Sequence, residues 1–374
     1  MSVEAGIDAV VGEALGRQAI VGSVIIVAKG GEPIYRKAAG WFDREERVPM
    51  REDAIFRLAS FTKPLVAAMA LALVEQGRLS LEAPVTAYLP HFTPPGPDGR
   101  PATIIISHLL AHTGGIVGGG PAFDAAGVGG GLADTDLWLD ENLRRLATVP
   151  LAHRPGEGWV YGKGLDVLGG VIAAVDGPTL GESLARHVTG PLGLADTGFT
   201  VSDRTRLGPV YADNPGAAPI RMVGTHDVPQ RDGPGTVTFT PDRVFNPQAF
   251  QSGGSGGVGT APDFFRFLET LRMGGRPILG RRTVTSGTQN LLGAVLRQPG
   301  SGFGHFGAVV TDPVAARTPQ PAGTYEWGGV YGHRWFVDPI NAITAVIMTN
   351  TAIEGCSGPF PLAVRDAIYS GFAG

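Results

Sequence analysis

The chain has 374 residues, of which 43% are hydrophobic and 17% are charged, and its net charge is −4. This is enough apolar material for a sizeable core, in one large domain or in two interlocked ones. The charge is nearly balanced and the basic residues are scattered, so we expect neither nucleic acid nor a membrane as a partner. The single cysteine, Cys356, excludes an internal disulfide and a cysteine metal cluster.

The N-terminal residues, MSVEAGIDAVVGEALG, are acidic and helix-like. They lack the basic region and the apolar core of a secretory signal. The longest apolar run, residues 65–74, is too short for a membrane span, which needs about 20 residues. We therefore expect a soluble cytoplasmic protein.

Patterns along the chain predict strands near both ends and helices between them. A helix is expected over 7–15, and two β-rich runs in 22–40 flank Gly30-Gly31, which is a hairpin signal. Helical periodicity then appears in six segments, 64–77, 104–112, 136–147, 164–175, 181–189 and 262–273. The chain continues with strand-like segments at 306–311, 324–332, 333–339 and 341–350, and with a helix at 361–371.

This order favours an α+β fold in which one antiparallel sheet is built from both termini and a mainly helical domain is inserted. We expect residues 1–60 and 255–374 to form the sheet domain and residues 61–254 the helical domain, with a cleft between them. Glycine- and proline-rich segments, 114–131 and 206–258, separate the helices. We expect 114–131 and 206–250 to wall the cleft.

Lysine is rare in this chain. It occurs only at Lys29, Lys37, Lys63 and Lys163, and all the remaining residues among the 30 basic ones are arginines. Arginine keeps its proton near neutral pH, whereas a lysine can lose it where its pKa is lowered. A lysine is therefore more informative here than in most sequences.

Ser60 and Lys63 form the only S-x-x-K pattern in the chain, within LASFTKP. If a helix begins near Ser60, the spacing puts both side chains on one face, and Pro64 fits only near a helix start. A neutral amine there could accept the serine proton. The spacing alone favours a capping serine followed by a surface lysine, but the apolar residues on both sides of the turn indicate burial.

Two further segments carry candidate groups. Tyr161, in PGEGWVYGKGLDVLG, lies at a predicted loop-to-helix junction, where it is either a proton relay or a buried aromatic with a satisfied hydroxyl. In TYEWGGVYGH, residues 324–333, glycines interrupt a strand pattern. Such glycines mark close approach of a ligand to the backbone, or a bulge and tight packing. An edge strand there could supply an N–H group to an oxyanion hole.

In this order, these pieces resemble the serine β-lactamase and penicillin-recognising fold, most closely its class C-like esterase branch, the family VIII carboxylesterases. The resemblance covers nearly the whole chain. Its blocks are FRLASFTKP, TIIISHLLAHTGG, PGEGWVYGKGLDVLGGVI, GPLGLADTGF, QSGGSGGVGTAPDFFRFL and WGGVYGHRWFVDP.

The resemblance implies a role for each matching residue. Ser60 would be the acyl-accepting nucleophile, Lys63 its general base or relay, and Tyr161 the group that carries the proton to and from the leaving group. The backbone N–H groups of Ser60 and Val330 would form the oxyanion hole. Which of lysine and tyrosine takes the first proton stays open. The third family motif would align with Trp327-Gly328-Gly329, which are expected to contact the substrate.

This sequence also departs from the β-lactamase pattern. Trp327 stands where that pattern has a lysine that helps to hold a substrate carboxylate, which argues against efficient β-lactam chemistry and suits less polar esters. Tyr161-Gly162-Lys163 replaces the expected Tyr-x-Asn. We hypothesise that Lys163 reaches the site and lowers the pKa of Lys63 and Tyr161, or replaces the missing anchor. The alternative is a surface lysine on the first turn of a helix.

Other candidates are weaker. Gly253-Gly254-Ser255-Gly256-Gly257 matches the G-x-S-x-G elbow of α/β-hydrolases, but no parallel βαβ pattern surrounds it and the required Asp-then-His order is missing. We expect Ser255 to line the pocket instead, together with His333. His108 and His112 have a metal-ligand spacing without a neighbouring glutamate or a third ligand, so we interpret both as structural.

The sequence thus predicts a serine hydrolase that cleaves small to medium carboxylic esters through an acyl-enzyme, with no metal and no cofactor. Amide or D-peptide hydrolysis, weak β-lactamase activity and acyl transfer are alternatives on the same fold. A non-catalytic binding protein is an alternative of another class, although Ser60, Lys63 and Tyr161 together argue against it. Nothing in the sequence predicts an oligomeric state.

Overall fold

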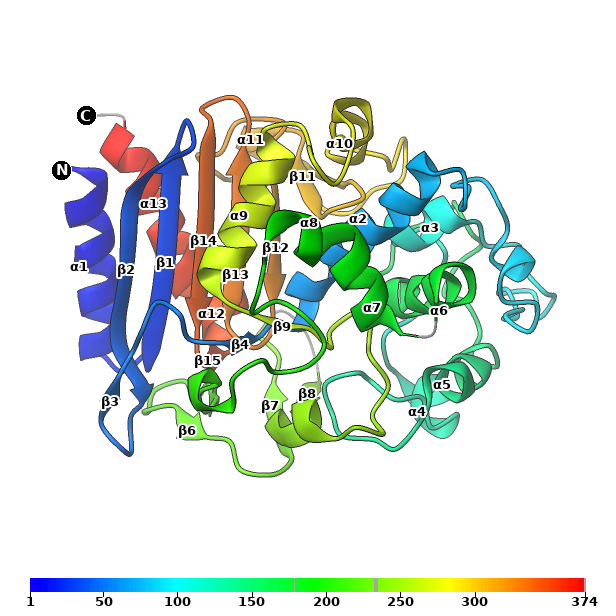
Figure 1. The fold of residues 1–374 in the computed structure, drawn as a ribbon, viewed down its shortest axis with the longest axis horizontal. Coiled ribbons are helices and arrows are strands. Elements are labelled where there is room, and N and C mark those ends of the chain that lie inside the picture. The colour runs from blue at the N-terminus through cyan, green and yellow to red at the C-terminus, as the bar shows by residue number, and fades with distance from the viewer. Residues whose placement is uncertain (178, 232–234, 373–374) are drawn as a thin grey trace.

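One half of the molecule is an eight-stranded sheet. The computed structural model describes residues 1–177, 179–231 and 235–372. The strand order is β10-β11-β12-β13-β14-β1-β2-β3, and every pairing is antiparallel. One pair inside the sheet joins opposite ends of the chain, β1 (Gly22–Lys29) with β14 (Ile343–Thr349) (Figure 1). The predicted fold, with a sheet built from both termini, is confirmed.

Of the other strands of this sheet, β2, β11, β12 and β13 correspond to predicted strands, whereas β3 and β10 were not predicted. The bounds of these strands are β2 (Glu32–Asp43), β3 (Val48–Pro49), β10 (Ser301–Phe303), β11 (Ala308–Val310), β12 (Tyr325–Gly329) and β13 (His333–Asp338). Between β1 and β2, Gly30 and Gly31 both have positive φ, 65° and 95°. Two-residue hairpin turns of this kind require positive φ, so glycine is needed at both positions.

Strand β1 is apolar on both faces because both faces of the sheet are covered. Successive side chains alternate across a strand. Val24 and Ile26 belong to the large core cluster, whereas Ile25 and Val27 belong to the core on the opposite face. A continuous apolar run is typical of such a strand.

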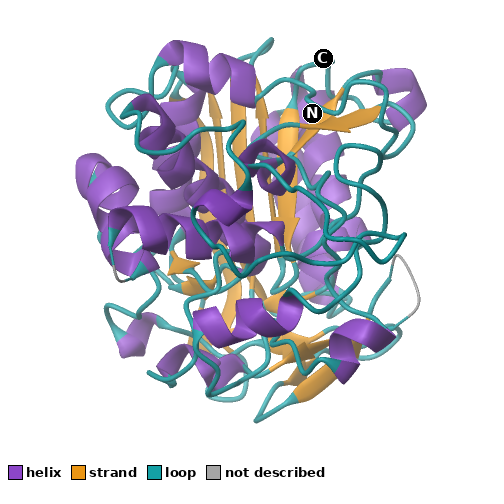
Figure 2. Ribbon diagram, turned by 90° about the vertical axis from the view of Figure 1, so that its right-hand side faces the viewer, coloured by secondary structure: helices purple, strands orange, loops and turns teal. Residues whose placement is uncertain are grey.

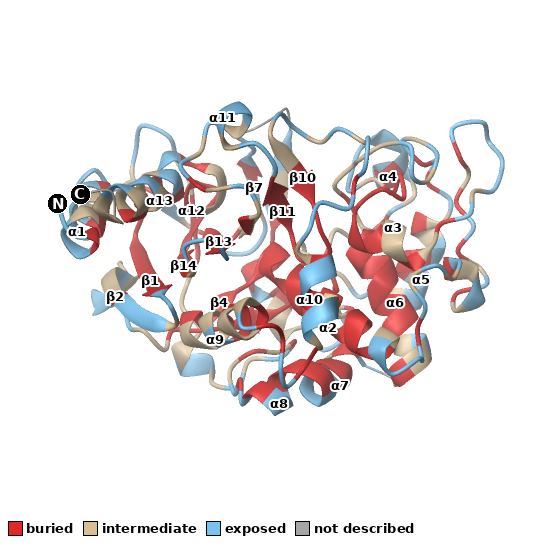
Figure 3. Ribbon diagram, turned by 90° about the horizontal axis from the view of Figure 1, so that it is seen from above, coloured by how far each residue is buried: buried red, intermediate tan, exposed pale blue. Residues whose placement is uncertain are grey.

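Helices α1 (Val3–Gly16) and α13 (Pro359–Phe372) cover one face of the sheet, and α9 (Ala261–Arg272) covers the other. Figure 2 shows helices on both sides of the strands, and Figure 3 shows that β1 and β14 are buried between them, whereas β2 is largely exposed or intermediate. No helix in the described ranges is long and apolar enough to cross a membrane.

Helix α2 (Thr62–Glu75) joins the sheet to the helical half of the molecule. Every residue from Thr62 to Leu73 is buried, so this helix has no solvent-facing stripe. The core around it is continuous from Val24 in the sheet to Val171 in α6. The proposed domain boundaries at 60/61 and 254/255 therefore stay a prediction, because one core spans both halves.

The helical half contains the predicted helices with small shifts in their ends. They are α3 (Ile106–Leu110), α5 (Leu139–Leu146), α6 (Gly164–Asp176) and α7 (Leu180–Leu184). The helix predicted over 181–189 is interrupted. After α7, residues Ala185–Thr189 form a π-type turn, and α8 (Gly190–Leu192) follows. Pro191 cannot donate a backbone hydrogen bond, which disfavours a regular continuation.

The segment 206–258 contains short elements that the sequence did not indicate. These include β5 (Tyr211–Ala212), β6 (Ile220–Arg221), β7 (His226–Pro229), β8 (Thr236–Phe239) and β9 (Val258–Gly259). Residues 232–234 of this segment, and 373–374 of the predicted sheet domain, lie outside the described residues. Short helices elsewhere also escaped prediction, namely α4 (Pro121–Ala125), α10 (Arg281–Gly287), α11 (Pro313–Ala316) and α12 (Glu354–Ser357).

Two buried arginines fix this segment through its backbone. Arg57 donates to the carbonyl oxygens of Pro241, at 2.8 Å, and Gly208, at 2.9 Å. Arg243 donates to Phe250 O at 2.6 Å. Neither arginine has a carboxylate within ion-pair distance among the described residues. Carbonyl groups that would otherwise be buried without a donor are thereby satisfied.

Candidate active site

Ser60 lies in a one-turn 3-10 helix, Ala59–Phe61, directly before α2. Ala59 has a positive φ of 46°, a conformation that costs a non-glycine residue about 1–2 kcal/mol. The turn is held from both sides by the glycine-rich segment 251–257. Leu58 N–H donates to Gly257 O at 2.8 Å, and Gly257 N–H donates to Thr62 Oγ1 at 2.9 Å.

The structure brings Ser60, Lys63 and Tyr161 together. Lys63 Nζ lies 3.1 Å from Ser60 Oγ, and the Tyr161 hydroxyl lies 2.6 Å from the same oxygen. Ser60 and Lys63 are each only 8% exposed. The predicted burial of the turn and the predicted proximity of serine and lysine are confirmed. A hydroxyl with two such neighbours is arranged to give up and recover a proton.

Lys63 is held by more than the serine. Its Nζ donates to Gly254 O at 2.7 Å and lies 4.6 Å from the centroid of the Tyr161 ring. The glycine-rich segment thus supplies a carbonyl acceptor for the ammonium. Among the described residues, no carboxylate lies within ion-pair distance of Lys63.

A buried carboxylate fixes the position of that carbonyl. Asp166, only 2% exposed, accepts hydrogen bonds from Ser252 Oγ at 2.5 Å and from Gly254 N–H at 3.3 Å. A Cβ built on Gly254 would lie 2.8 Å from the Asp166 carboxylate, so glycine is required there. The sequence analysis missed Asp166. The available signal was an acidic residue within the apolar helix GLDVLGGVI.

Lys163 faces this network rather than the nucleophile. Its Nζ donates to Gly130 O and lies 3.9 Å from Asp166 Oδ2. Burial lowers the pKa of the Lys163 ammonium; Asp166 opposes that shift, and the charge of Lys63 adds to it. Neither Ser60 nor Tyr161 is a hydrogen-bond partner of Lys163 in the described part of the chain. Its side chain is 13% exposed, so the alternative of a surface lysine is wrong.

Strand β12 completes the site. Trp327 Nε1 donates to the Tyr161 hydroxyl oxygen at 3.3 Å. A Cβ built on Gly329 would lie 2.5 Å from Leu58 O, and one on Gly328 would lie 2.7 Å from Cys356 Sγ. Both glycines are thus required by packing within the chain, which favours the tight-packing explanation over close approach of a ligand.

Val330 follows β12 at the end next to the Ser60 turn. Its carbonyl accepts a hydrogen bond from Ile353 N–H at 3.0 Å. Ile353 itself has φ 65° and ψ −58°, a strained conformation for a β-branched residue. The backbone around Val330 is therefore held in place from the side of α12. Its part in an oxyanion hole stays a prediction.

An aromatic cluster surrounds Tyr161. The Trp327 ring lies 5.1 Å from the Tyr161 ring and 5.0 Å from Phe303, and the Trp159 ring lies 5.6 Å from Phe303. His112 lies 4.8 Å from Tyr161. We call these five residues the aromatic wall. Burial lowers the pKa of His112 well below its ordinary value, so a neutral ring supports the tyrosine.

The remaining candidates do not meet the nucleophile. Ser255 is 9% exposed, and its hydroxyl lies 3.1 Å from Ser252 Oγ. A short strand, β9, rather than a helix follows it, so the elbow motif is absent. His333 is completely buried between Phe56 and Phe61. The expectation that His333 contacts substrate is therefore wrong. Its Nε2 donates to Arg57 O at 2.9 Å and so holds the backbone just before the Ser60 turn.

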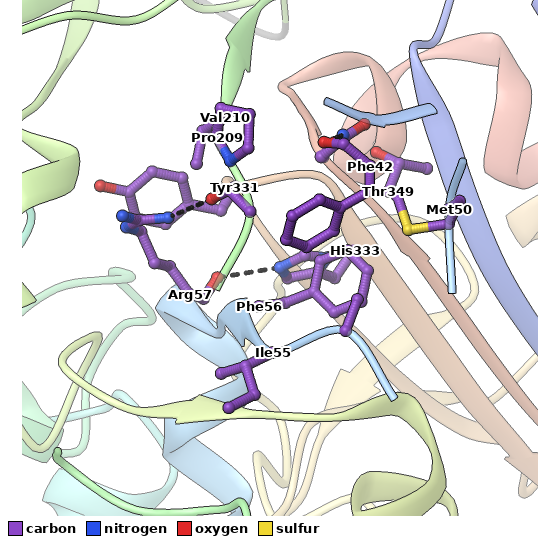
Figure 4. Close-up of a pocket in the computed structure, with 13 residues that line it drawn as sticks. Phe42, Met50, Ile55, Phe56, Arg57, Pro209, Val210, Tyr331, His333 and Thr349 are labelled. Atoms are coloured by element: carbon purple, nitrogen blue, oxygen red, sulfur yellow. Dashed lines mark hydrogen bonds between the residues drawn. The ribbon is translucent and has the colours of Figure 1, made fainter. Parts of the chain in front are cut away.

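His333 also borders a separate small cavity. Figure 4 shows it between Phe42, Phe56, Val210 and Tyr331. Ser60, Lys63 and Tyr161 are not among its lining residues, so it is distinct from the cluster that these three residues form. No cluster of three or more His, Cys, Asp or Glu side chains suited to a metal occurs in the described residues.

Comparison with known proteins assigns the family. A family model described as Beta-lactamase matches residues 7–358. The chain belongs to the beta-lactamase family. It is 46% identical to Esterase EstB of Burkholderia gladioli, over 99% of this chain and 96% of that protein.

Two solved structures have the same fold. One is described as EstCE1, a hydrolase with promiscuous acyltransferase activity; it has a TM-score of 0.93 and 40% identity over 98% of both chains. Unliganded simvastatin synthase (LovD) from Aspergillus terreus has a TM-score of 0.75 and 21% identity, over 100% of this chain and 99% of that chain. This second likeness shows the fold alone.

Proposed function

We propose that this chain is a serine carboxylesterase of the family VIII type that works through an acyl-enzyme. The observation that carries the proposal is the pair of contacts at Ser60 Oγ, 3.1 Å from Lys63 Nζ and 2.6 Å from the Tyr161 hydroxyl. The identity to Esterase EstB over nearly the full length supports an ester as substrate.

In the first half of the reaction, Ser60 Oγ attacks the ester carbonyl carbon. Its proton passes to Tyr161 in its phenolate form or to Lys63 in its neutral amine form, both within hydrogen-bond distance, while the carbonyl electrons move to the oxygen. The backbone N–H groups of Ser60 and Val330 would stabilise that oxyanion. When the carbonyl re-forms, the C–O bond to the alcohol breaks, and the departing alkoxide takes the proton.

In the second half, water replaces the alcohol. The same side chains take a proton from water as its oxygen attacks the acyl carbon. The bond to Ser60 Oγ then breaks, the carboxylic acid leaves, and Oγ recovers its proton. Trp327 Nε1–H and the Lys63 ammonium above the ring lie where they would stabilise negative charge on Tyr161 during either half.

The cleft favours small to medium esters over β-lactams. Trp327 gives the site an indole where the β-lactamase pattern has a lysine, and the aromatic wall extends this apolar surface. Lys163 is engaged with Gly130 and Asp166, so it replaces the missing anchor only if a substrate displaces these contacts.

Acyl transfer is a second candidate. The similar structure EstCE1 is described as a hydrolase with promiscuous acyltransferase activity. An acyl-enzyme at Ser60 serves either outcome, because an alcohol can attack it in place of water. Adding methanol or butanol to an assay with vinyl acetate would reveal transfer as the corresponding acetate ester.

The test compares wild type with Ser60→Ala and Ser255→Ala on p-nitrophenyl acetate and butyrate. We expect Ser60→Ala to lose at least about a thousandfold in kcat, and Ser255→Ala to stay close to wild type. Activity that survives Ser60→Ala would contradict the proposal. Wild type that turns over nitrocefin or D-aminoacyl amides, but no ester, would favour the amidase alternatives. Absence of all turnover would favour a binding protein.

A further inference from the structure

A positive charge lies on the aromatic wall, and no step proposed above uses it. Arg297 Cζ is 5.0 Å from the ring centroid of Trp159 and 5.4 Å from that of Trp327. Both are cation–π distances. Trp327 donates to Tyr161, which in turn contacts Ser60. Two side chains therefore separate the guanidinium from the nucleophile.

Arg297 comes from residues 289–300, a segment without helix or long strand. Leu292 and Val295 anchor this segment in the cluster that contains Phe303 and Trp327. The anchoring fixes Arg297 on the wall rather than leaving it in solvent, and its side chain is half-buried. Residues 289–300 therefore lie against the aromatic wall, a contact that the sequence did not predict.

The hydrogen bonds of Arg297 leave donors unused. Nη1 donates to Ser301 Oγ at 2.5 Å, whereas Nε is buried without an acceptor. No carboxylate lies within 4.0 Å in the described part of the chain. The neighbouring Glu326 bonds to Arg334 and Gln320 instead. A guanidinium has five N–H donors, so several remain for a ligand.

The positive charge of Arg297, like its unused hydrogen-bond donors, favours an anionic ligand. Burial lowers the pKa of Arg297 to about 10, so the group stays cationic at neutral pH. His112, below Tyr161, is affected by the positive charges of both Lys63 and Arg297. The site therefore has two cations within electrostatic range of one buried ring. A half-buried cation with spare donors favours an anion, and a carboxylate matches the guanidinium fork.

We infer that Arg297 binds a carboxylate carried by the substrate, so that the preferred esters have a free acid group on one side of the scissile bond. This inference rests on the proposed esterase function and names a class of substrate for it. Half-esters of dicarboxylic acids have the charge on the acyl side, and acylated hydroxy acids have it on the alcohol side. Both offer the same chemistry to Arg297.

A purely structural role is the competing explanation. Arg297 also stacks on two indoles, and this would stiffen Trp327 and hence Tyr161. Loss of such support would reduce turnover of every ester by the same factor. Loss of a carboxylate site would reduce turnover of charged esters more than of neutral ones.

The experiment measures kcat/KM by pH-stat for matched pairs of esters. Monoethyl glutarate against ethyl butyrate tests the acyl side, and 3-acetoxypropanoate against propyl acetate tests the alcohol side. The proteins are wild type, Arg297→Met, Arg297→Lys and Arg282→Met. Arg282 is an exposed arginine of α10, so its variant matches the change in net charge without touching the wall.

We expect Arg297→Met to lower the charged-to-neutral ratio of kcat/KM at least tenfold for one pair, and the pair that responds identifies the side. Arg297→Lys should lower it less, Arg282→Met should leave it unchanged, and added salt should weaken the wild-type preference. An equal loss on charged and neutral esters, or an unchanged ratio, overturns the inference. Failure of the proposed function is separate, since it would show as wild type inactive on all four esters, charged and neutral alike.

Discussion

The surroundings of Ser60 and the segment 206–258 solve the same problem in different ways. Both bury polar groups that need partners. Around Ser60, the partners are a lysine and a tyrosine, groups that can exchange protons. In 206–258, Arg57 and Arg243 donate to backbone carbonyls and keep their protons at any physiological pH.

This difference explains the uneven use of basic residues. Arginine supplies fixed charges and forked donors where the chain must be held in place. Of the four lysines, Lys63 and Lys163 belong to the site and its supporting network, whereas Lys37 forms exposed ion pairs with Glu4 and Asp8. We therefore expect proton transfer and scaffolding to depend on different side chains, and the following experiments test that separation.

The largest effect is expected from Tyr161→Phe. Removing the hydroxyl takes away one of the two groups that reach Ser60 Oγ, so kcat/KM for p-nitrophenyl butyrate should fall about a hundred- to ten-thousandfold. Stability to urea should change little. Tyr88→Phe is the matched control, because Tyr88 donates no contact to the site and its oxygen only accepts from Ser80 N–H. A loss below tenfold would exclude Tyr161 from proton transfer.

The second-largest effect is expected from acid, which should lower the free energy of unfolding through His333. Burial holds the pKa of His333 at about 4, so the folded protein keeps this ring neutral. Below about pH 6.5 the unfolded chain binds the proton first, and stability falls until about pH 4. The loss is roughly 3 kcal/mol for this histidine at most. Urea unfolding at pH 7 and pH 4.5 measures it.

The same measurement on His333→Gln should show a smaller difference between the two pH values. His226→Gln, in the segment 206–258, is the comparison variant, because its ring is half-buried and bonds to Val223. If His333→Gln and wild type lose the same stability between pH 7 and pH 4.5, protonation of His333 does not contribute to the loss of stability in acid.

Arg243→Met tests whether a buried arginine holds the backbone of the segment 206–258 in place. Loss of its donor leaves Phe250 O buried without a partner, which should reduce the free energy of unfolding by about 2 kcal/mol. Protease cleavage within 206–258 should accelerate, while kcat for small esters should fall less than for Tyr161→Phe. The exposed Arg204→Met is the control. A variant that unfolds like wild type would show that the segment does not depend on this arginine.

The smallest effect is expected from Trp327→Phe. The ring keeps its place in the aromatic wall, but the Nε1–H donor to Tyr161 is lost. A neutral hydrogen bond is worth about 0.5–1.5 kcal/mol, so kcat should fall by roughly tenfold at most. The pH profile of kcat distinguishes this from a packing defect, since a lost donor to Tyr161 should displace the profile and a packing defect should only lower it.

Local sequence patterns predicted the features that are determined by residues close together in the chain. The Ser60–Lys63 spacing, the Gly30-Gly31 turn and the apolar strands belong to this group. Asp166 and Ser252 could not be paired, because 86 residues separate them and each is unremarkable alone. The position of the His333 side chain could not be predicted from the sequence either, since it is determined by the packing of β13 against the Ser60 turn. The cytoplasmic location and the catalytic roles stay predictions.

The pairing of β1 with β14 has a consequence for the timing of assembly. A ribosome makes Ser60 early, but the strand that carries Trp327 and the strand that closes the sheet come more than 250 residues later. Contacts of such long range form slowly and only after the late segments have emerged. The pairing of β1 with β14 and the contact of Trp327 with Tyr161 are therefore absent during most of synthesis.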